Sequence, residues 1–150
     1  MKKCLPIAMG LLILISTACT DKSRFVEPDF ILRKWSRAIE EMNYKDYASC
    51  EAYPKEEGVF REMYREYYPV DLHTVKLDDH NEKDVKTDFE KNRYVKRIVY
   101  FEGSLVDRKL RRVTELIKGD ALFIRFLDGK RERDGWLLSN RTIMRMKIKK

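Results

Sequence analysis

The spacing of apolar residues changes at Pro69, and this change constrains the fold more than any other feature. Before Pro69, Ile31, Trp35, Ala38 and Met42 lie three or four residues apart, the spacing of one face of an amphipathic helix. After Pro69, apolar residues alternate with polar ones, as in a half-buried strand. The change predicts an α+β fold, with N-terminal helices packed on a curved antiparallel sheet.

Three helices are expected before the change. The first begins near Pro28, which suits a first helical turn, and ends at Asn43. Asp46 is the expected N-cap of the second. The third ends before Pro69, because the residue preceding a proline disfavours helical geometry. The expected helices cover residues 28–43, 47–52 and 57–67.

Strands are expected after Pro69. The apolar residues of segment 70–77 change phase at His73 and Thr74, which predicts a β-bulge there. Residues 78–91 are charged and predict a solvated connection. Residues 94–101 are β-branched and aromatic and predict the best strand of the chain, ended by Gly103 and Ser104.

Segment 105–118 fits two structures. Val106, Leu110 and Val113 have helical spacing. In contrast, Gly119-Asp120 lies between two apolar runs and is typical of a tight hairpin turn. We predict a strand here, with a helix as the alternative. The last expected strands cover residues 121–126, 136–138 and 142–146.

A separate signal lies at the N-terminus. Lys2 and Lys3 precede an apolar run over residues 5–15, and small residues 16–18 lead to Cys19. As a helix the run would rise only about 16 Å, against about 30 Å for the hydrocarbon core of a bilayer. Basic, then apolar, then small residues is the order of a secretory signal peptide.

The residues before Cys19 resemble the lipobox of bacterial lipoproteins, in which cleavage precedes a lipidated cysteine. Ala18 and Thr17 match, whereas Ser16 stands where an aliphatic residue is usual. The resemblance implies cleavage between Ala18 and Cys19, fatty acyl chains such as palmitate on Cys19, and attachment to a bacterial cell membrane or outer membrane on the periplasmic or surface side. An ordinary signal peptide or an uncleaved N-terminal anchor is the alternative. The expected parts are the signal peptide (1–18), the lipidated cysteine and tether (19–28) and a single domain (29–150).

Cys50 is the one cysteine that remains beyond Cys4 and Cys19. A catalytic thiol needs a nearby base or positive charge that lowers its pKa. No His, Lys or Arg lies within four residues of Cys50 on either side in sequence, so we expect a buried structural thiol.

Two short segments resemble the nuclear transport factor 2-like group of cystatin-type α+β cones. They are Met42-Asn-Tyr-Lys-Asp-Tyr47, at the end of the first helix, and Gly135-Trp-Leu-Leu-Ser-Asn-Arg141, in the last strands. The similarity spans about residues 29–146 and implies a cone-like fold. That group includes isomerases, dehydratases, scaffolds and lipoproteins, so the resemblance does not decide function. Residues expected to line a pocket in such a cone are Trp35, Tyr64 and Trp136.

Candidate chemistry is sparse. Enzymes of the cone type use a carboxylate in an apolar pocket to move protons, and Glu102, which follows the aromatic Tyr100-Phe101, is the catalytic candidate. His73 and His80 lie among acidic residues but match no compact metal motif, so a solvated acidic loop is expected. No nucleotide-binding, nucleophile or CxxC motif is present, and we expect no metal and no cofactor.

Charge divides the chain into two halves. Residues 20–85 contain 11 Lys and Arg against 16 Asp and Glu, whereas residues 86–150 contain 19 against 9. A basic surface attracts anionic partners, and the export signal favours lipid headgroups or another anionic envelope component over nucleic acid. Solubility alone is the alternative explanation. The basic residues of the expected surface are Arg108, Arg111, Arg112, Lys130, Arg131 and Arg133.

Together these features predict a membrane-anchored envelope lipoprotein. Its domain is expected to bind a ligand or another envelope protein without catalysis. A small-molecule isomerase or dehydratase of the cone type is the alternative.

Overall fold

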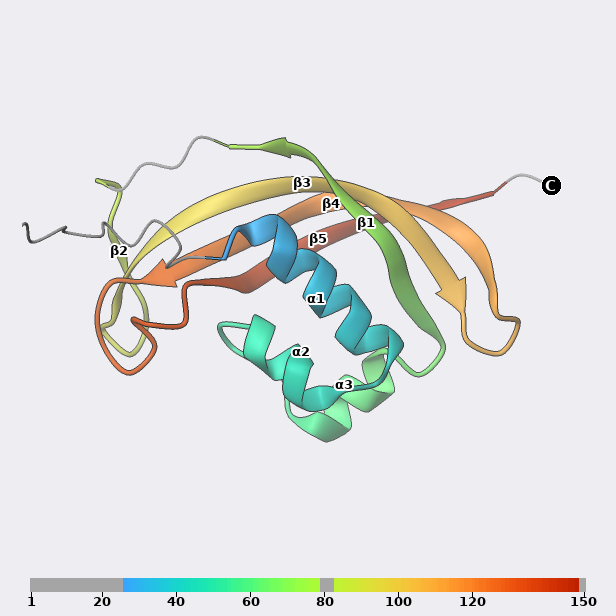
Figure 1. The fold of residues 1–150 in the computed structure, drawn as a ribbon, viewed down its shortest axis with the longest axis horizontal. Helices are drawn as coiled ribbons and strands as arrows, with labels where there is room; N and C mark the ends of the chain where they lie inside the picture. Colours follow the sequence, from blue (N-terminus) through green and yellow to red (C-terminus); the bar gives the residue numbers. More distant parts are fainter. Residues whose placement is uncertain (1–25, 79–82, 149–150) are drawn as a thin grey trace, which may run out of the picture.

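The computed structural model describes residues 26–78 and 83–148, which form three helices and five strands. The helices precede the strands, as the change of period at Pro69 predicts, and the α+β class is confirmed. Figure 1 shows the helices on one side of the sheet, whose long strands arch over them. The elements are α1 (Pro28–Glu40), α2 (Tyr44–Cys50), α3 (Glu57–Met63), β1 (Tyr67–Leu77), β2 (Lys86–Thr87), β3 (Arg93–Asp107), β4 (Arg112–Phe126) and β5 (Trp136–Lys147).

The sheet is antiparallel in the order β1–β3–β4–β5, and the short β2 also pairs with β3. Consecutive long strands are neighbours, so β3, β4 and β5 form a meander. The predicted bulge in β1 is confirmed, because the register shifts between Val70 and His73 and again between Thr74 and Lys76. Since β2 lies within residues 78–91, the expectation of a connection without strands there was wrong.

The junction between the first two helices differs from the prediction. α1 ends at Glu40, and Met42 adopts a left-handed φ of 53° that reverses the chain. Asn43, expected to end the first helix, is instead the N-cap of α2, because its side chain accepts a hydrogen bond from the backbone N–H of Asp46 at 3.2 Å. Capping by Asn at this position is as favourable as capping by Asp, so α2 begins earlier than Asp46 predicted.

Two glycines that were expected to end strands lie inside them. Gly103 lies within β3, and Gly119 lies within β4, so the expected hairpin at Gly119-Asp120 was wrong. A Cβ at Gly119 would collide with the backbone carbonyl of Thr142 on β5, and one at Gly103 would collide with Leu72. Glycine is required by the close approach of a neighbouring strand. The turn of this hairpin instead lies between Asp107 and Arg112, and segment 105–118 is strand on both sides of it.

The core lies between the helices and the inner face of the sheet, meaning the face that the helices cover. Trp35 on α1, Tyr47 on α2 and Phe60 on α3 pack in one cluster with Phe101 and Phe123 of the sheet, and each of these side chains is at most 1% exposed. Full burial of such a side chain contributes about 1.5–3 kcal/mol. The space between α1 and the central strands β3 and β4 is therefore filled by side chains.

Candidate functional site

A hollow opens beside this filled core, between α3 and β5. It comprises two neighbouring cavities of about 500 Å³ and about 200 Å³, which share Met63, Tyr64 and Ile143 in their walls. We call the two cavities together the α3–β5 depression. The other lining residues are Tyr47, Glu51, Tyr53, Lys55, Ser139, Asn140 and Arg141 in the larger cavity, and Trp35, Tyr67, Pro69, Leu105 and Arg145 in the smaller one.

A buried ion pair lies in the wall of the larger cavity. Nη1 of Arg141 donates to Oε1 of Glu51 at 2.9 Å, and Nε1 of Trp35 donates to the same oxygen at 2.8 Å. Nη2 of Arg141 donates to the Tyr64 hydroxyl at 2.6 Å, and the guanidinium lies 4.5 Å from the centre of the Trp35 ring. The Glu51 side chain is 4% exposed. These four residues therefore connect α1, the end of α2, the end of α3 and β5.

Backbone pairing places Glu51 in this position. Glu51 directly follows α2 and forms an isolated parallel bridge with Leu138 on β5. The N–H of Ala52 donates to the carbonyl of Leu138 at 2.8 Å. Nη1 of Arg131, from the β4–β5 connection, donates to the carbonyls of Glu51 and Ala52 at 3.1 Å and 2.7 Å. The segment is thus held at the edge of the sheet, with the carboxylate turned towards α1.

Burial sets the acid–base properties of this group of residues. It raises the pKa of the Glu51 carboxyl, while the positive charge of Arg141 and the hydrogen bond from Trp35 oppose the increase. Burial also raises the pKa of Tyr64 to about 12, despite the opposing charge of Arg141. Desolvation disfavours the charged form of both groups, so Tyr64 is a neutral phenol.

A second arginine–carboxylate pair lies at the other end of the depression. Nε and Nη2 of Arg145 donate to the two carboxylate oxygens of Glu115 at 2.6 Å and 3.1 Å. The guanidinium also lies 4.9 Å from the centre of the Tyr67 ring. A bidentate pair of this kind fixes the plane of the guanidinium. Both arginines of the depression are thus neutralised by a carboxylate and stacked on an aromatic ring.

Between the two pairs the surface is apolar and reaches solvent. Met63 is 51% exposed and Ile143 is 37% exposed, while Tyr64, Tyr67 and Pro69 line the smaller cavity beside them. Concave apolar surface with a few fixed polar groups is the usual form of a small-molecule site. The arrangement suits a neutral ligand with an aromatic or aliphatic body and a hydrogen-bonding group.

Of the three residues predicted to line a pocket, two lie in the walls of the depression and one does not. Trp35 and Tyr64 line the depression. Trp136 is 5% exposed, lies under the guanidinium of Arg125 and is absent from the walls of the described cavities. Trp136 therefore belongs to the core.

The catalytic candidate Glu102 lies elsewhere. Its side chain is 55% exposed, and Nε2 of His73 lies 3.9 Å from its carboxylate. Glu102 pairs across the sheet with Lys118, on the outer face away from the helices. Glu102 therefore does not lie in an apolar pocket, where a catalytic carboxylate of the cone type is expected.

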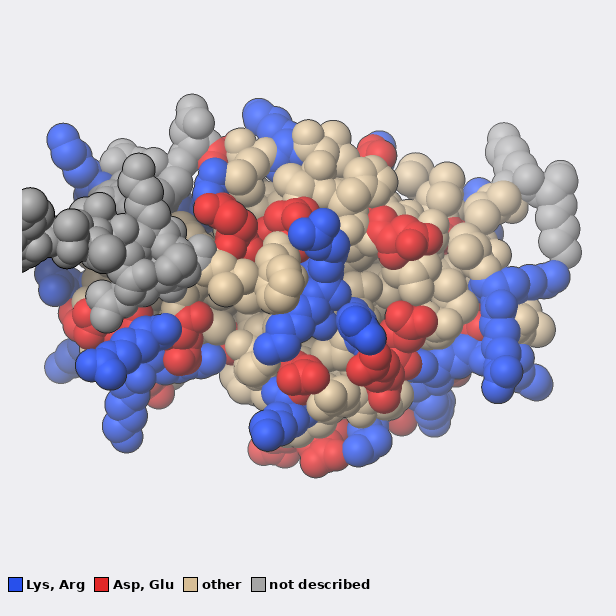
Figure 2. All heavy atoms as spheres, in the orientation of Figure 1, with Lys and Arg blue, Asp and Glu red and all other residues tan. Residues whose placement is uncertain are grey.

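The six basic residues predicted as one surface lie at opposite ends of the sheet. Arg108, Arg111 and Arg112 belong to the β3–β4 turn, whereas Lys130, Arg131 and Arg133 belong to the β4–β5 connection; the 15 residues of β4 separate the two groups. Figure 2 shows Lys and Arg side chains projecting at both ends of the long axis and mixed with Asp and Glu between them.

Two of the six residues serve the fold. Arg108 donates to the carbonyls of Ile39, Glu40 and Tyr64, at the C-terminal ends of α1 and α3. Cations stabilise these ends because the helix dipole is negative there. Arg131 binds the segment after α2, as described above. Arg108 and Arg131 are therefore committed to contacts within the protein.

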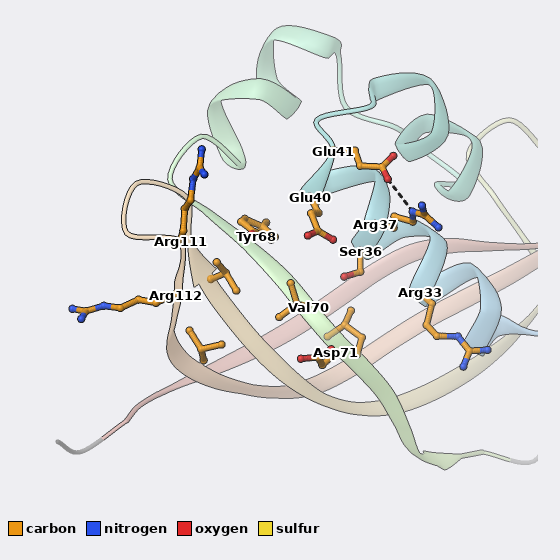
Figure 3. Close-up of a pocket in the computed structure, with 13 residues that line it drawn as sticks. Arg33, Ser36, Arg37, Glu40, Glu41, Tyr68, Val70, Asp71, Arg111 and Arg112 are labelled. Atoms are coloured by element: carbon orange, nitrogen blue, oxygen red, sulfur yellow. Dashed lines mark hydrogen bonds and ion pairs between the residues drawn. The ribbon is translucent and has the colours of Figure 1, made fainter.

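A larger hollow lies between α1 and β1 (Figure 3). Its volume is about 860 Å³, and charged residues of α1 form one wall. Arg37 and Glu41 in this wall form an ion pair at 2.9 Å, and Arg33 pairs with Asp29 at 2.8 Å. Ser36 donates to the carbonyl of Pro69 at 2.6 Å and so covers the edge of β1. Since both ion pairs lie within α1 and Ser36 connects α1 to β1, we interpret this hollow as the seam between the two layers.

Within residues 26–78 and 83–148, no group of His, Cys, Asp and Glu has the arrangement of a metal site. His73 is exposed, and His80 lies outside the described residues. Cys50 is buried, and burial raises its pKa to about 11, in agreement with the prediction of an unreactive thiol. The expected signal peptide and Cys19 also lie outside the described residues. In the described part of the chain, none of the helices has the length and apolar character needed to cross a bilayer.

Glu51 and Arg141 were not identified from the sequence. Glu51 lies between Cys50 and Ala52, and Arg141 lies three residues after the apolar Trp136–Leu138 run. That placement is a weak signal of a buried pair, because 90 residues separate the partners. Comparisons with protein-family models, with curated proteins and with solved structures find no match. The function must therefore be inferred from the chemistry of the depression.

Proposed function

We propose that the chain is a bacterial envelope lipoprotein whose folded domain binds a neutral, partly apolar ligand in the α3–β5 depression. The order of residues before Cys19 supports the anchor, and the charged tether would keep the domain near the membrane. The observation that carries the binding function is the exposed apolar surface of Met63 and Ile143 between two neutralised arginines. The ligand can be a small molecule or an apolar side chain of another envelope protein.

The contacts of Glu51 favour binding over catalysis. Its Oε1 already accepts hydrogen bonds from Trp35 and from Arg141. A general base must accept a proton from the substrate at hydrogen-bonding distance, and here a fixed cation opposes that transfer. The pair instead holds the ends of α2 and α3 against β5, so that it shapes the wall of the depression.

The curved sheet and its helical cover also support the proposed cone-like fold. In that arrangement the open mouth lies where helices leave part of the inner face uncovered. The α3–β5 depression suits such a mouth, because Ile143 of β5 lines it beside Met63 of α3 and is 37% exposed.

A small-molecule isomerase or dehydratase is the second candidate, and one observation favours it. Glu51 is a buried carboxylate with a raised pKa in the wall of a cavity, next to the neutral hydroxyl of Tyr64. Carboxyls with shifted pKa values occur often in active sites. Glu51→Gln separates the two functions, because it would abolish turnover but retain a hydrogen-bonding side chain of nearly the same shape.

Binding can be tested with the neutral fluorescent probe N-phenyl-1-naphthylamine. We expect its emission to rise with the protein and the rise to be lost in Ile143→Glu, which places a charge between the two cavities. Met144→Glu is the matched control, since Met144 is the next residue, is 52% exposed and lies on the opposite face of β5. Equal loss in both variants, or no binding by the wild-type protein, would contradict the proposed site.

The anchor is tested independently by mass spectrometry of the protein extracted from bacterial membranes. We expect the mature chain to begin at Cys19 and to carry a diacylglyceryl group and an acyl chain. An intact Met1, or a free thiol at a mature Cys19, would contradict the lipoprotein assignment but would leave the binding test unaffected.

A further inference from the structure

One end of the sheet carries a concentration of exposed apolar side chains. The β3–β4 turn, the start of β4 and the end of β5 meet there (Figure 1). Six large apolar residues at this end are between 39% and 52% exposed. We call this region the strand-end surface; its apolar residues are Leu110, Val113, Leu116, Met144, Met146 and Ile148.

The strand register makes most of these side chains neighbours. Leu116 lies directly opposite Met146, and Met144 is two residues from Met146 on the same face. Side chains opposite one another on paired antiparallel strands are about 4.5–5.5 Å apart at Cβ. Val113 is the second residue of β4, and Leu110 lies in the turn before it. Leu116, Met144 and Met146 therefore form one apolar strip on the outer face, and Val113 and Leu110 lie towards the turn.

Three cations lie beside this patch without an ion-pair partner among the described residues. They are Lys109, Arg111 and Arg112. Figure 3 shows Arg111 and Arg112 extended away from the strands at the turn. Arg111 also adopts a left-handed φ of 51°, which turns the chain between Leu110 and β4.

Three acidic groups at this end have partners within the protein. Oδ1 of Asp107 accepts the backbone N–H of Leu110 at 2.8 Å, and Glu115 holds Arg145. Glu66 lies near the turn, where its carbonyl accepts the N–H of Arg108, and its carboxylate is 3.6 Å from Arg65. The strand-end surface is therefore apolar at its centre and positively charged around it.

An anionic bilayer matches both parts of this surface. Burial of apolar side chains at the boundary between headgroups and acyl chains lowers the free energy of binding. Each nearby Lys or Arg lowers it further through attraction to the negative surface potential. An acidic polymer would satisfy the cations but would leave the six apolar side chains in water. Exposed apolar patches with a polar rim are typical of interaction sites.

We propose that the strand-end surface docks on a bilayer containing anionic phospholipid, with Leu110 and its apolar neighbours in the interface and the three cations at the headgroups. This contact goes beyond the proposed ligand site and does not depend on lipidation of Cys19. In an anchored protein it would be a second attachment, which would orient the domain on the membrane surface.

The test places an environment-sensitive nitrobenzoxadiazole fluorophore on Leu110→Cys of the full mature chain. Wild-type protein taken through the same labelling reports any signal from Cys19 or from the buried Cys50. We expect the emission from position 110 to rise and shift to the blue with phosphatidylcholine vesicles that contain phosphatidylglycerol, and to return as salt is added. Phosphatidylcholine vesicles alone should give no change.

Two matched pairs of substitutions locate the contact. Arg111→Ser with Arg112→Ser should lower the docking equilibrium constant about 25-fold at low salt, since each cation near the surface is worth about fivefold. Lys130→Ser with Arg133→Ser removes the same charge from the opposite end of the sheet and should leave docking unchanged. Docking weakened equally by both pairs would overturn the proposal.

Two further outcomes would also overturn it. One is an unchanged fluorophore at position 110 with anionic vesicles; the other is an equal change at Lys130→Cys, which would show general adsorption. A response to polyglutamate as strong as the response to vesicles would assign the surface to an acidic polymer instead. Absence of lipidation would appear only in the mass of the peptide that contains Cys19. The lipoprotein assignment and the docking proposal can therefore be tested independently.

Discussion

The inner face of the sheet beneath α1 and the strand-end surface are built from the same strands but expose apolar side chains very differently. Beneath α1, Phe101 and Phe123 are at most 1% exposed. At the strand end, Leu116 and Met144 are about half exposed. Both regions combine apolar residues with arginine, yet Arg141 is fully partnered whereas Arg111 and Arg112 have no ion pair among the described residues.

This difference separates stability from interaction. Apolar area removed from water stabilises the fold by about 25 cal/mol per Å². In the region beneath α1, nearly all of the apolar area is removed from water. The strand-end surface contributes little by the same measure, because its side chains remain in water. We therefore expect substitutions in the covered region to change the free energy of unfolding, and those at the strand end to change binding.

The largest effect is expected for Trp35→Ala. This change removes a side chain that is 0% exposed and the hydrogen bond to Glu51, and we expect it to lower the free energy of unfolding by about 4 kcal/mol. Met144→Ala, at the strand end, should change it by less than about 0.5 kcal/mol. Urea denaturation followed by circular dichroism measures both, and similar losses would remove the distinction between the two regions.

Breaking the buried ion pair is expected to have the next largest effect. Arg141→Leu leaves Glu51 buried without its cation, and loss of one partner of a buried pair costs about 3 kcal/mol or more. Arg145→Leu breaks the more exposed pair with Glu115, which should cost about 1 kcal/mol or less. Chemical denaturation compares the two, and an equal cost would mean that Glu51 and Arg141 do not act as a buried pair.

Gly119 lies where the covered region passes into the strand end. In Gly119→Ala the new methyl group would meet the carbonyl of Thr142, which is backbone and must shift with β5. We expect a loss of about 2 kcal/mol, typical of overpacking. Hydrogen exchange should show the loss as faster exchange of amides between β4 and β5. Unchanged amide exchange would contradict the close approach of the Thr142 carbonyl to Gly119.

The pH dependence of stability tests the burial of Glu51. Its pKa is raised from 4.5 in the folded protein, so its contribution to stability is complete below that value and is lost as pH rises through the folded pKa. The stability advantage of wild type over Glu51→Gln should therefore decrease with rising pH. Asp128 has a pKa lowered by hydrogen bonds from Arg93, so the advantage over Asp128→Asn should decrease as pH falls. Thermal melts at a series of pH values measure the direction of both changes in stability.

Local pattern predicted the helices, the bulge in β1 and the α+β class, because each depends on residues close in sequence. It failed at Gly119, because a glycine between two apolar runs can lie either in a turn or inside a strand. The contact with Thr142 on β5, which decides between them, cannot be known from the neighbouring residues. It also joined Arg112 and Lys130 into one surface, although β4 holds them far apart. The pair of Glu51 and Arg141 was missed because only the tertiary fold brings its members together.

The smallest effect is expected at Gly58, in the first turn of α3. A Cβ there would meet nothing within 4 Å, and Gly58 has no left-handed φ. Gly58→Ala should therefore stabilise the protein by about 0.5 kcal/mol, by restricting the unfolded chain. Because α3 carries Met63 and ends at Tyr64, a firmer α3 should preserve binding of N-phenyl-1-naphthylamine in the depression while leaving docking of the strand end unchanged. A higher melting temperature with lost probe binding would instead show that the depression must open at α3 for a ligand to enter.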